Sequence, residues 1–132
     1  MVNENPKKCN EWPILTEKEV ADTFDGGDVG AVWELITEDS IRKLRRTFTA
    51  KNFQAALDFI NLAGAAAEKR GHHPDFHLTS YRNVTVVIYT HSLKGLTEND
   101  FLLATDINAC KVLYSPKWLR ENSAATFTAL EN

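Results

Sequence analysis

The amino-acid sequence predicts an α+β domain in which a four-stranded antiparallel sheet carries three helices packed on one face. The 132 residues suffice for one hydrophobic core and are too few for two. Segments of strand character come in two pairs, and segments of helical character precede, separate and follow these pairs. This order lacks the alternation of a parallel α/β fold. We therefore expect a single domain over residues 1–132, with its core at about 16–112 between an N-terminal segment and a C-terminal tail.

The first three elements are read from the N-terminal half of the chain. Thr16, followed three residues later by Glu19, is typical of a capping box, so TEKEVADTF is predicted as a helix that ends at the glycine-rich DGGDVG. AVWELIT (31–37) and SIRKLRRTFTA (40–50) are rich in branched and aromatic residues, and the turn-forming EDS lies where they meet. These two segments are predicted to form a hairpin.

A long helix is predicted from Lys51 to Arg70, with Gly71 just past its C-terminus. It has two apolar stripes. The first contains Phe53, Ala56, Leu57, Ile60, Ala63, Gly64 and Ala67, and the second contains Ala55, Phe59, Leu62 and Ala66. A sheet covers only one stripe, and burying a large apolar side chain is worth roughly 1.5 to 3 kcal/mol. We therefore expect a homotetramer or homodimer with Phe59 and Leu62 at or near an interface between copies of this helix.

The remaining elements follow the long helix. DFHLTSY (75–81) and VTVVIYTHS (84–92) are predicted strands joined at RN. Thr97 is expected to cap a last helix over residues 98–114. The tail that follows is rich in alanine, serine and threonine, and we expect it to be unstructured beyond Trp118.

Charge and hydropathy exclude several classes of protein. With 18 acidic and 15 basic residues the formal charge is −3, so no overall field attracts nucleic acid or an anionic membrane. The basic stretch IRKLRR is better explained as a strand with one solvated basic face. No apolar run approaches the roughly 20 residues that span a bilayer, and the N-terminus lacks the apolar core of a secretory signal. We expect a cytoplasmic protein, with the nucleus as a further compartment, whereas a removed organelle-targeting peptide would leave no trace.

The two cysteines, Cys9 and Cys110, give no disulfide framework and fit a reducing compartment. Cys9 lies in a polar N-terminal segment that we expect to be loosely held. Neither cysteine is near the histidines in sequence, so a zinc site built on both residue types is not indicated.

All four histidines lie in the stretch EKRGHHPDFHLTSYRNVTVVIYTHS. Pro74 disfavours the helical conformation for His73, and extended neighbours point in opposite directions. His72 and His73 would therefore chelate one metal ion poorly, but they could hold a flat ligand from two sides or divide binding from chemistry. Glu68 lies one helical turn before His72, where its carboxylate could orient an imidazole.

Ordinary structural roles fit the same residues. Imidazoles after a helix C-terminus are favoured by the helix dipole, so the histidine pair fits a solvated terminus. His77 fits a polar strand position, and His91 fits the surface at a strand end. Asp100 lies three residues after Thr97, where it would complete a capping box.

The spacing of these residues separates the two interpretations, because it resembles the signature of the pterin-4a-carbinolamine dehydratase family, also known as the dimerisation cofactor of a homeodomain transcription factor. The matching pattern is Glu68, three residues, His72-His73-Pro74, six residues, Tyr81, nine residues, His91, eight residues and Asp100. The resemblance extends from about Thr16 to Val112 and includes the order of elements. Phe76 departs from it, because many relatives have tryptophan near this position, and the segment between Pro74 and Tyr81 is the longer of two family variants.

The resemblance implies that the chain is a hydro-lyase acting on 4a-hydroxytetrahydropterin, in tetrahydrobiopterin recycling or related pterin metabolism. The product is quinonoid dihydropterin, and imidazoles can serve as acid and base without a metal or an organic cofactor. The implied catalytic residues are His72 and His91 as acids and His73, which chiefly holds the substrate. The implied substrate-binding residues are Glu68, His72, His73, Pro74, Thr90, His91, Ser92 and Leu93, with Tyr81 and Asp100 as supporting residues.

Two other functions stay open. The resemblance also implies that a member can act as a protein-binding module, a dimerisation cofactor or coactivator for a transcription factor. The histidine cluster could instead bind metal. Intact histidines favour the enzyme, because a pure scaffold has no physical use for them. We expect a pterin as the small-molecule partner and no direct contact with nucleic acid or membrane.

Overall fold

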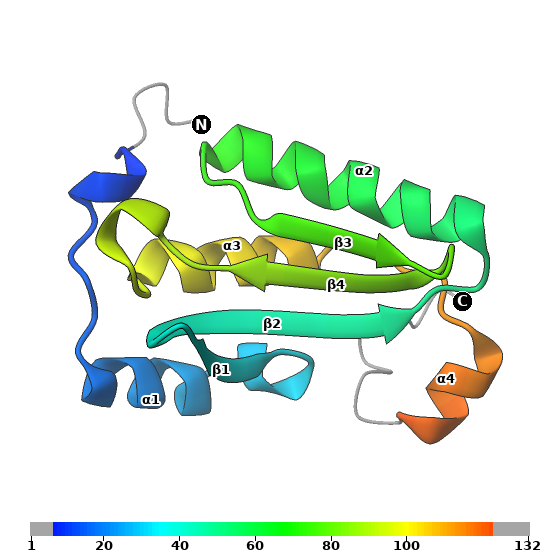
Figure 1. Ribbon diagram of the computed structural model, residues 1–132, viewed down its shortest axis with the longest axis horizontal. Helices are drawn as coiled ribbons and strands as arrows, with labels where there is room; N and C mark the ends of the chain where they lie inside the picture. Colours follow the sequence, from blue (N-terminus) through cyan, green and yellow to red (C-terminus); the bar gives the residue numbers. More distant parts are fainter. Residues whose placement is uncertain (1–6, 123–132) are drawn as a thin grey trace.

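The computed structural model describes residues 7–122 and has the predicted α+β architecture (Figure 1). One antiparallel sheet has the strand order β1-β2-β4-β3. The strands are β1 (Glu34–Glu38), β2 (Ile41–Thr49), β3 (Asp75–Thr79) and β4 (Asn83–Ile88). The helices are α1 (Glu17–Gly26), α2 (Phe53–Arg70), α3 (Glu98–Asn108) and α4 (Pro116–Glu121), with short 3₁₀ turns η1 (Cys9–Glu11), η2 (Val29–Ala31) and η3 (His91–Leu93). Among the helices of residues 7–122, none combines the length and apolar character needed to cross a membrane.

The hairpin turns use left-handed backbone rather than glycine. Asp39 and Ser40, with φ of 54° and 65°, form the two-residue turn between β1 and β2, as predicted at EDS. In the second hairpin the left-handed pair is Ser80 and Tyr81, with φ of 46° and 56°. Thr79 pairs with Asn83, so β3 ends before the predicted RN turn and Tyr81 belongs to the turn rather than to a strand.

One face of the sheet is covered by helices. Alternate residues of β2 and β4 point into the core, among them Leu44, Phe48, Val84, Val86 and Ile88. Phe48 meets Phe59 of α2 edge to face, with ring centroids 4.9 Å apart. Figure 1 shows α2 and α3 lying against this same face of the sheet.

The chain after α3 differs from the prediction. The helix ends at Asn108 instead of continuing to residue 114. The Asn108 Oδ1 accepts hydrogen bonds from Trp33 Nε1 at 2.8 Å and from the buried Arg46 at 3.3 Å, so the side chain ties α3 to the sheet. Lys51 N then donates to Leu113 O at 2.9 Å, which holds this segment in extended form.

A fourth helix, α4, replaces part of the predicted unstructured tail and reaches Glu121, three residues beyond Trp118. Ser115 caps it by accepting a hydrogen bond from Trp118 N at 3.3 Å, and Pro116 occupies its first turn. The tail from residue 123 onward lies outside the described residues.

Helix α2 turns a different face to the core from the one expected. Its buried residues are Ala55, Ala56, Phe59, Ala63 and Ala67, so the expected interface residue Phe59 is 1% exposed within the monomer. Leu62 is 47% exposed and Phe53 49%. Each predicted stripe therefore contributes residues to the core. The buried face lies at the border between the two stripes, and exposed apolar residues remain on both sides of it.

We predict that Phe59→Ala lowers the free energy of unfolding by about 3 to 5 kcal/mol, because the ring is enclosed against Phe48 and its loss leaves a cavity. Leu62→Ala, on the same helix but half exposed, is the control and costs less than about 1 kcal/mol. Urea denaturation of both variants measures the difference. Equal losses would contradict the burial of Phe59 in the core of the monomer.

Candidate active site

The Asp100 carboxylate lies at the centre of the candidate site and is 0% exposed. Its Oδ2 accepts hydrogen bonds from Thr97 N (2.8 Å), Thr97 Oγ1 (3.2 Å) and Thr90 Oγ1 (2.8 Å). Its Oδ1 lies 2.5 Å from His72 Nε2. The predicted capping box of α3 is therefore confirmed, and the residue that completes it also binds an imidazole.

The end of α2 directs His72 into the protein. Gly71 takes the left-handed conformation, with φ of 70°, and His72 N donates to Ala67 O at 3.2 Å, so the chain reverses at once. His72 is 3% exposed. A carboxylate only accepts hydrogen bonds, so the proton between His72 and Asp100 is carried by Nε2. In the neutral imidazole the lone pair is then at Nδ1.

Nδ1 of His72 faces a residue that the sequence did not suggest. The Cys9 Sγ lies 3.0 Å from this nitrogen and 3.3 Å from Gly71 O. Burial, and secondly the nearby negative charge of Asp100, raise the pKa of Cys9, which favours the thiol over the thiolate.

The N-terminal segment is not loosely held over the part that the structure describes. Ile14 forms a β-bridge with Thr97, and Leu15 N donates to Leu96 O at 2.9 Å. Cys9 and His72 are 63 residues apart in sequence, and a thiol in a polar segment carries no local signal of such a contact.

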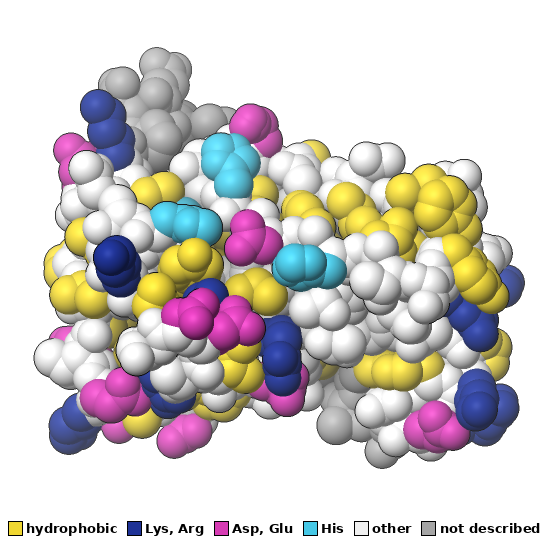
Figure 2. All heavy atoms as spheres, in the orientation of Figure 1, with side chains coloured by type: hydrophobic (Ala, Val, Ile, Leu, Met, Phe, Trp, Pro, Cys, Tyr) yellow, Lys and Arg dark blue, Asp and Glu magenta, His cyan; other side chains and the backbone are white. Residues whose placement is uncertain are grey.

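The other two histidines of the set are exposed. His73 Nε2 lies 3.1 Å from Glu68 Oε1, and the two side chains are 65% and 70% exposed. His91 begins η3 rather than ending a strand, and its ring centroid lies 4.1 Å from that of Tyr89. Exposed histidines lie on the face shown in Figure 2 with acidic side chains among them.

The hairpin of β3 and β4 brings the predicted residues together. Asp75 pairs with Val87, so the start of β3, just after His73 and Pro74, lies beside the end of β4, just before Thr90 and His91. Ser92 and Leu93 follow in η3. Glu68, His72, His73, Pro74, Thr90, His91, Ser92, Leu93 and Asp100 thus belong to segments that meet at one end of the sheet.

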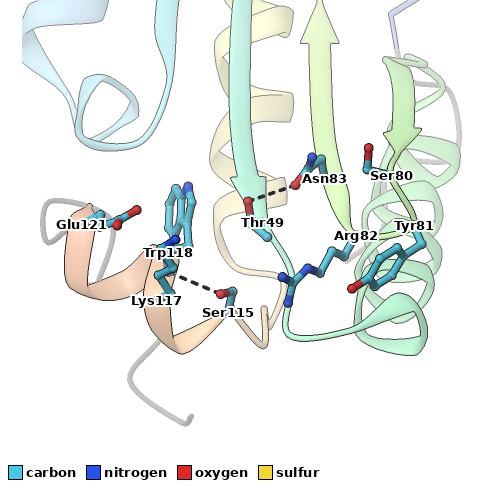
Figure 3. A pocket seen from close by; sticks show the side chains of 9 residues that line it. All are labelled: Thr49, Ser80, Tyr81, Arg82, Asn83, Ser115, Lys117, Trp118 and Glu121. Carbon is cyan, nitrogen blue, oxygen red and sulfur yellow. Dashed lines mark hydrogen bonds between the residues drawn. The ribbon is translucent and has the colours of Figure 1, made fainter.

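Tyr81 is not part of this group, which corrects its expected supporting role. It is 58% exposed in the turn at the opposite end of β3. Seven residues at about 3.3 Å each put this turn roughly 20 Å from Pro74. There Tyr81 lines a separate groove together with Arg82 and Trp118 (Figure 3).

Metal binding has a simple geometric obstacle in this arrangement. The two nitrogens of His72 point in different directions, one to Asp100 and the other to Cys9. In the part of the chain from residue 7 to residue 122, no three His, Cys, Asp or Glu side chains are grouped so as to hold a metal ion. What the arrangement offers chemically is proton transfer by imidazoles, two of them open to solvent and one buried against a carboxylate.

Comparisons with known proteins connect this geometry to one family. The sequence model described as "Pterin 4 alpha carbinolamine dehydratase" matches residues 13–110. "Pterin-4-alpha-carbinolamine dehydratase 2, mitochondrial" of Arabidopsis thaliana is 45% identical over 107 residues, which are 81% of this chain and 56% of that protein. A "Putative pterin-4-alpha-carbinolamine dehydratase" of Nitrosococcus oceani is 53% identical over 72 residues, 54% of this chain and 63% of that one. The chain thus covers less than two thirds of either relative.

A solved structure agrees with the sequence comparisons. It is described as the "transcriptional coactivator/pterin dehydratase from Brucella Melitensis". It superposes with a TM-score of 0.62 at 34% identity, and the match covers 74% of this chain and 97% of that one. The shared region therefore includes most of the fold.

We predict that Asp100→Ala lowers the free energy of unfolding by on the order of 3 kcal/mol, because it removes a helix cap and leaves buried donors of Thr90 and Thr97 without a partner. The control is Asp22→Ala, whose carboxylate is 66% exposed and forms an exposed ion pair with Lys18, and which changes stability by about 0.5 kcal/mol at most. Urea denaturation at neutral pH measures both. Similar losses in the two variants would contradict a central role for Asp100.

Proposed function

The chain belongs to the pterin 4 alpha carbinolamine dehydratase family, and we propose that it removes water from a 4a-hydroxytetrahydropterin to give a quinonoid dihydropterin. The observation that carries this proposal is the set of three imidazoles at one end of the sheet, with His72 buried on Asp100 and with His73 and His91 exposed. A protein that only holds a partner has no use for two exposed imidazoles beside this buried pair. The same set therefore favours the enzyme over a partner-binding module without catalysis.

The reaction needs only two proton transfers. The substrate carries a hydroxyl on a ring carbon beside a ring nitrogen, whose lone pair forms the C=N bond as the C–O bond breaks. A proton added to the departing oxygen gives water, and the proton of a ring nitrogen is lost to a base. Imidazole suits both transfers near neutral pH, and each positioned transfer contributes roughly 10²- to 10⁴-fold.

We assign the residue roles from exposure and contacts. His91 is exposed and protonates the departing oxygen. His73, which is hydrogen-bonded to Glu68, holds the pterin ring, and this pair can accept its proton. His72 is the second acid, an alternative proton donor to the same departing oxygen, and it can act only through Nδ1, because Nε2 is committed to Asp100.

The remaining predicted residues shape the site in two ways. Thr90 is 1% exposed and its hydroxyl is bound to Asp100, so it acts on the ligand by positioning His91 rather than by contact. Pro74, Ser92 and Leu93 lie next to the exposed histidines and supply the lining of the pterin site.

The protein also has an apolar surface suited to self-association, and we propose a homodimer or homotetramer. Phe53, Leu57, Ile60 and Gly64 line one flank of α2 and are half-buried or exposed. Hydrophobic atoms gather at the end of the molecule where α2 begins (Figure 2). An apolar flank of this kind is usually covered in a soluble protein.

We predict that the protein accelerates the disappearance of freshly generated 4a-hydroxytetrahydropterin above its spontaneous dehydration, followed by absorbance. His91→Ala lowers kcat by about 10²-fold or more. His77→Ala is the control, because His77 projects from the middle of β3 and is paired across from Thr85, away from the site. Absence of acceleration would overturn the proposed function, and a loss in His77→Ala as large as in His91→Ala would overturn the proposed site.

We predict that Phe53→Glu shifts the protein to smaller species in sedimentation velocity at micromolar concentration. Phe53 is the first residue of α2, where a carboxylate is favoured by the helix dipole, so the fold is retained. Leu62→Glu is the control and leaves the assembly intact, because nine residues along a helix place Leu62 about 180° away on the other flank. A wild-type monomer would refute self-association, and dissociation by Leu62→Glu alone would move the interface to that flank.

A further inference from the structure

Of the two ring nitrogens of His72, Nδ1 is the one left to exchange a proton with a ligand, and the Cys9 thiol lies against it. Nε2 is held by the buried carboxylate of Asp100, and the ring is 3% exposed. The contact within hydrogen-bond distance of Nδ1 is the Cys9 Sγ at 3.0 Å. Any proton that His72 exchanges with a bound ligand must therefore pass Cys9.

The thiol has a partner in either protonation state of the ring. When His72 is neutral, the Cys9 S–H donates to Nδ1. When His72 is protonated, Nδ1–H points at the sulfur, and the S–H can turn to Gly71 O at 3.3 Å. Because Cys9 is held as a thiol rather than a thiolate, it keeps this donor throughout.

The position of Cys9 is built into the fold. The segment 9–15 is anchored on the loop between His91 and Thr97 by the Ile14 bridge to Thr97. Gly95 leaves the space for Ile14, because a Cβ at Gly95 would lie only 2.7 Å from Ile14 Cδ1. The segment that carries Cys9 and the loop that carries His91 therefore pack as one unit.

We propose that Cys9 is a positioning residue for the reaction. Its thiol hydrogen-bonds to Nδ1 of His72 and thereby controls proton exchange between this imidazole and the substrate. The proposal rests on the proposed dehydratase function. It makes the N-terminal segment part of the active site, and it adds the Cys9 thiol to the histidine, glutamate and aspartate side chains that the sequence predicted.

The first test does not depend on activity. ¹⁵N NMR of labelled protein, at a pH where His72 is neutral, reports the hydrogen bond accepted by Nδ1. Cys9→Ala moves the Nδ1 resonance toward that of an unbonded ring nitrogen, and Cys9→Ser, which keeps a hydroxyl donor, moves it back. Cys110→Ala, which removes the other thiol, changes nothing. An Nδ1 resonance that is the same in wild type and Cys9→Ala would overturn the proposal, whether or not the protein is a dehydratase.

The second test addresses the role in turnover. Loss of one hydrogen bond to the acid lowers kcat by up to roughly tenfold in Cys9→Ala, with KM nearly unchanged and with recovery in Cys9→Ser. An unchanged kcat beside a shifted Nδ1 resonance would reduce Cys9 to a structural contact. An inactive wild type with a shifted resonance would refute the dehydratase while leaving the contact in place.

A reversible modification separates this role from folding. Methyl methanethiosulfonate converts the thiol to a mixed disulfide, with sulfinate as the leaving group, and dithiothreitol restores it. Wild-type activity should fall on modification and return on reduction, while the Cys9→Ser variant, which retains Cys110, is insensitive. Full activity with Cys9 completely modified would contradict the proposal.

Discussion

The buried Asp100 carboxylate is the constraint on which the site depends. A charge without solvent contact is tolerated only when its lone pairs are satisfied, and here the donors come from three distant segments. Thr97 belongs to the start of α3, Thr90 to the end of β4, and His72 to the turn after α2. The requirement to solvate one carboxylate internally therefore fixes the relative positions of these three segments, and with them two of the three histidines.

The hairpin of β3 and β4 is the second feature that positions the site, because it brings the two exposed histidines together. It leaves the site immediately after His73 and returns to it immediately before His91, so both exposed imidazoles lie at the same end.

Arg46 plays a comparable structural role farther along the sheet. It is 2% exposed and donates to Tyr114 Oη at 2.7 Å, and burial lowers its pKa while this contact opposes the shift. Of these two buried charged residues, Asp100 organises the site and Arg46 joins β2 to the chain after α3.

Those features of the fold and the site that depend on local spacing could be predicted from the sequence. The capping boxes at Thr16 and Thr97 are set by residues three positions apart, and the alternation in β4 reports directly which side is buried. Features that depend on tertiary contact were missed. The core face of α2 combines residues of both apolar stripes, and packing of Phe59 against Phe48, rather than the spacing, places that face on the sheet. Tyr81 has the residue type of a strand but the backbone of a turn.

In the proposed mechanism, the contacts of the two acids, His72 and His91, give them different ways to regain a proton. His91 is open to solvent and can be reprotonated by water between turnovers. His72 is enclosed between Asp100 and Cys9, so its proton must return past the sulfur. The enclosed acid gains a fixed orientation and a counter-charge, while its exchange becomes coupled to the N-terminal segment. A site with one exposed and one enclosed imidazole can therefore combine rapid reprotonation at His91 with controlled proton transfer at His72. The spacing of the histidines in the sequence does not reveal this difference between them.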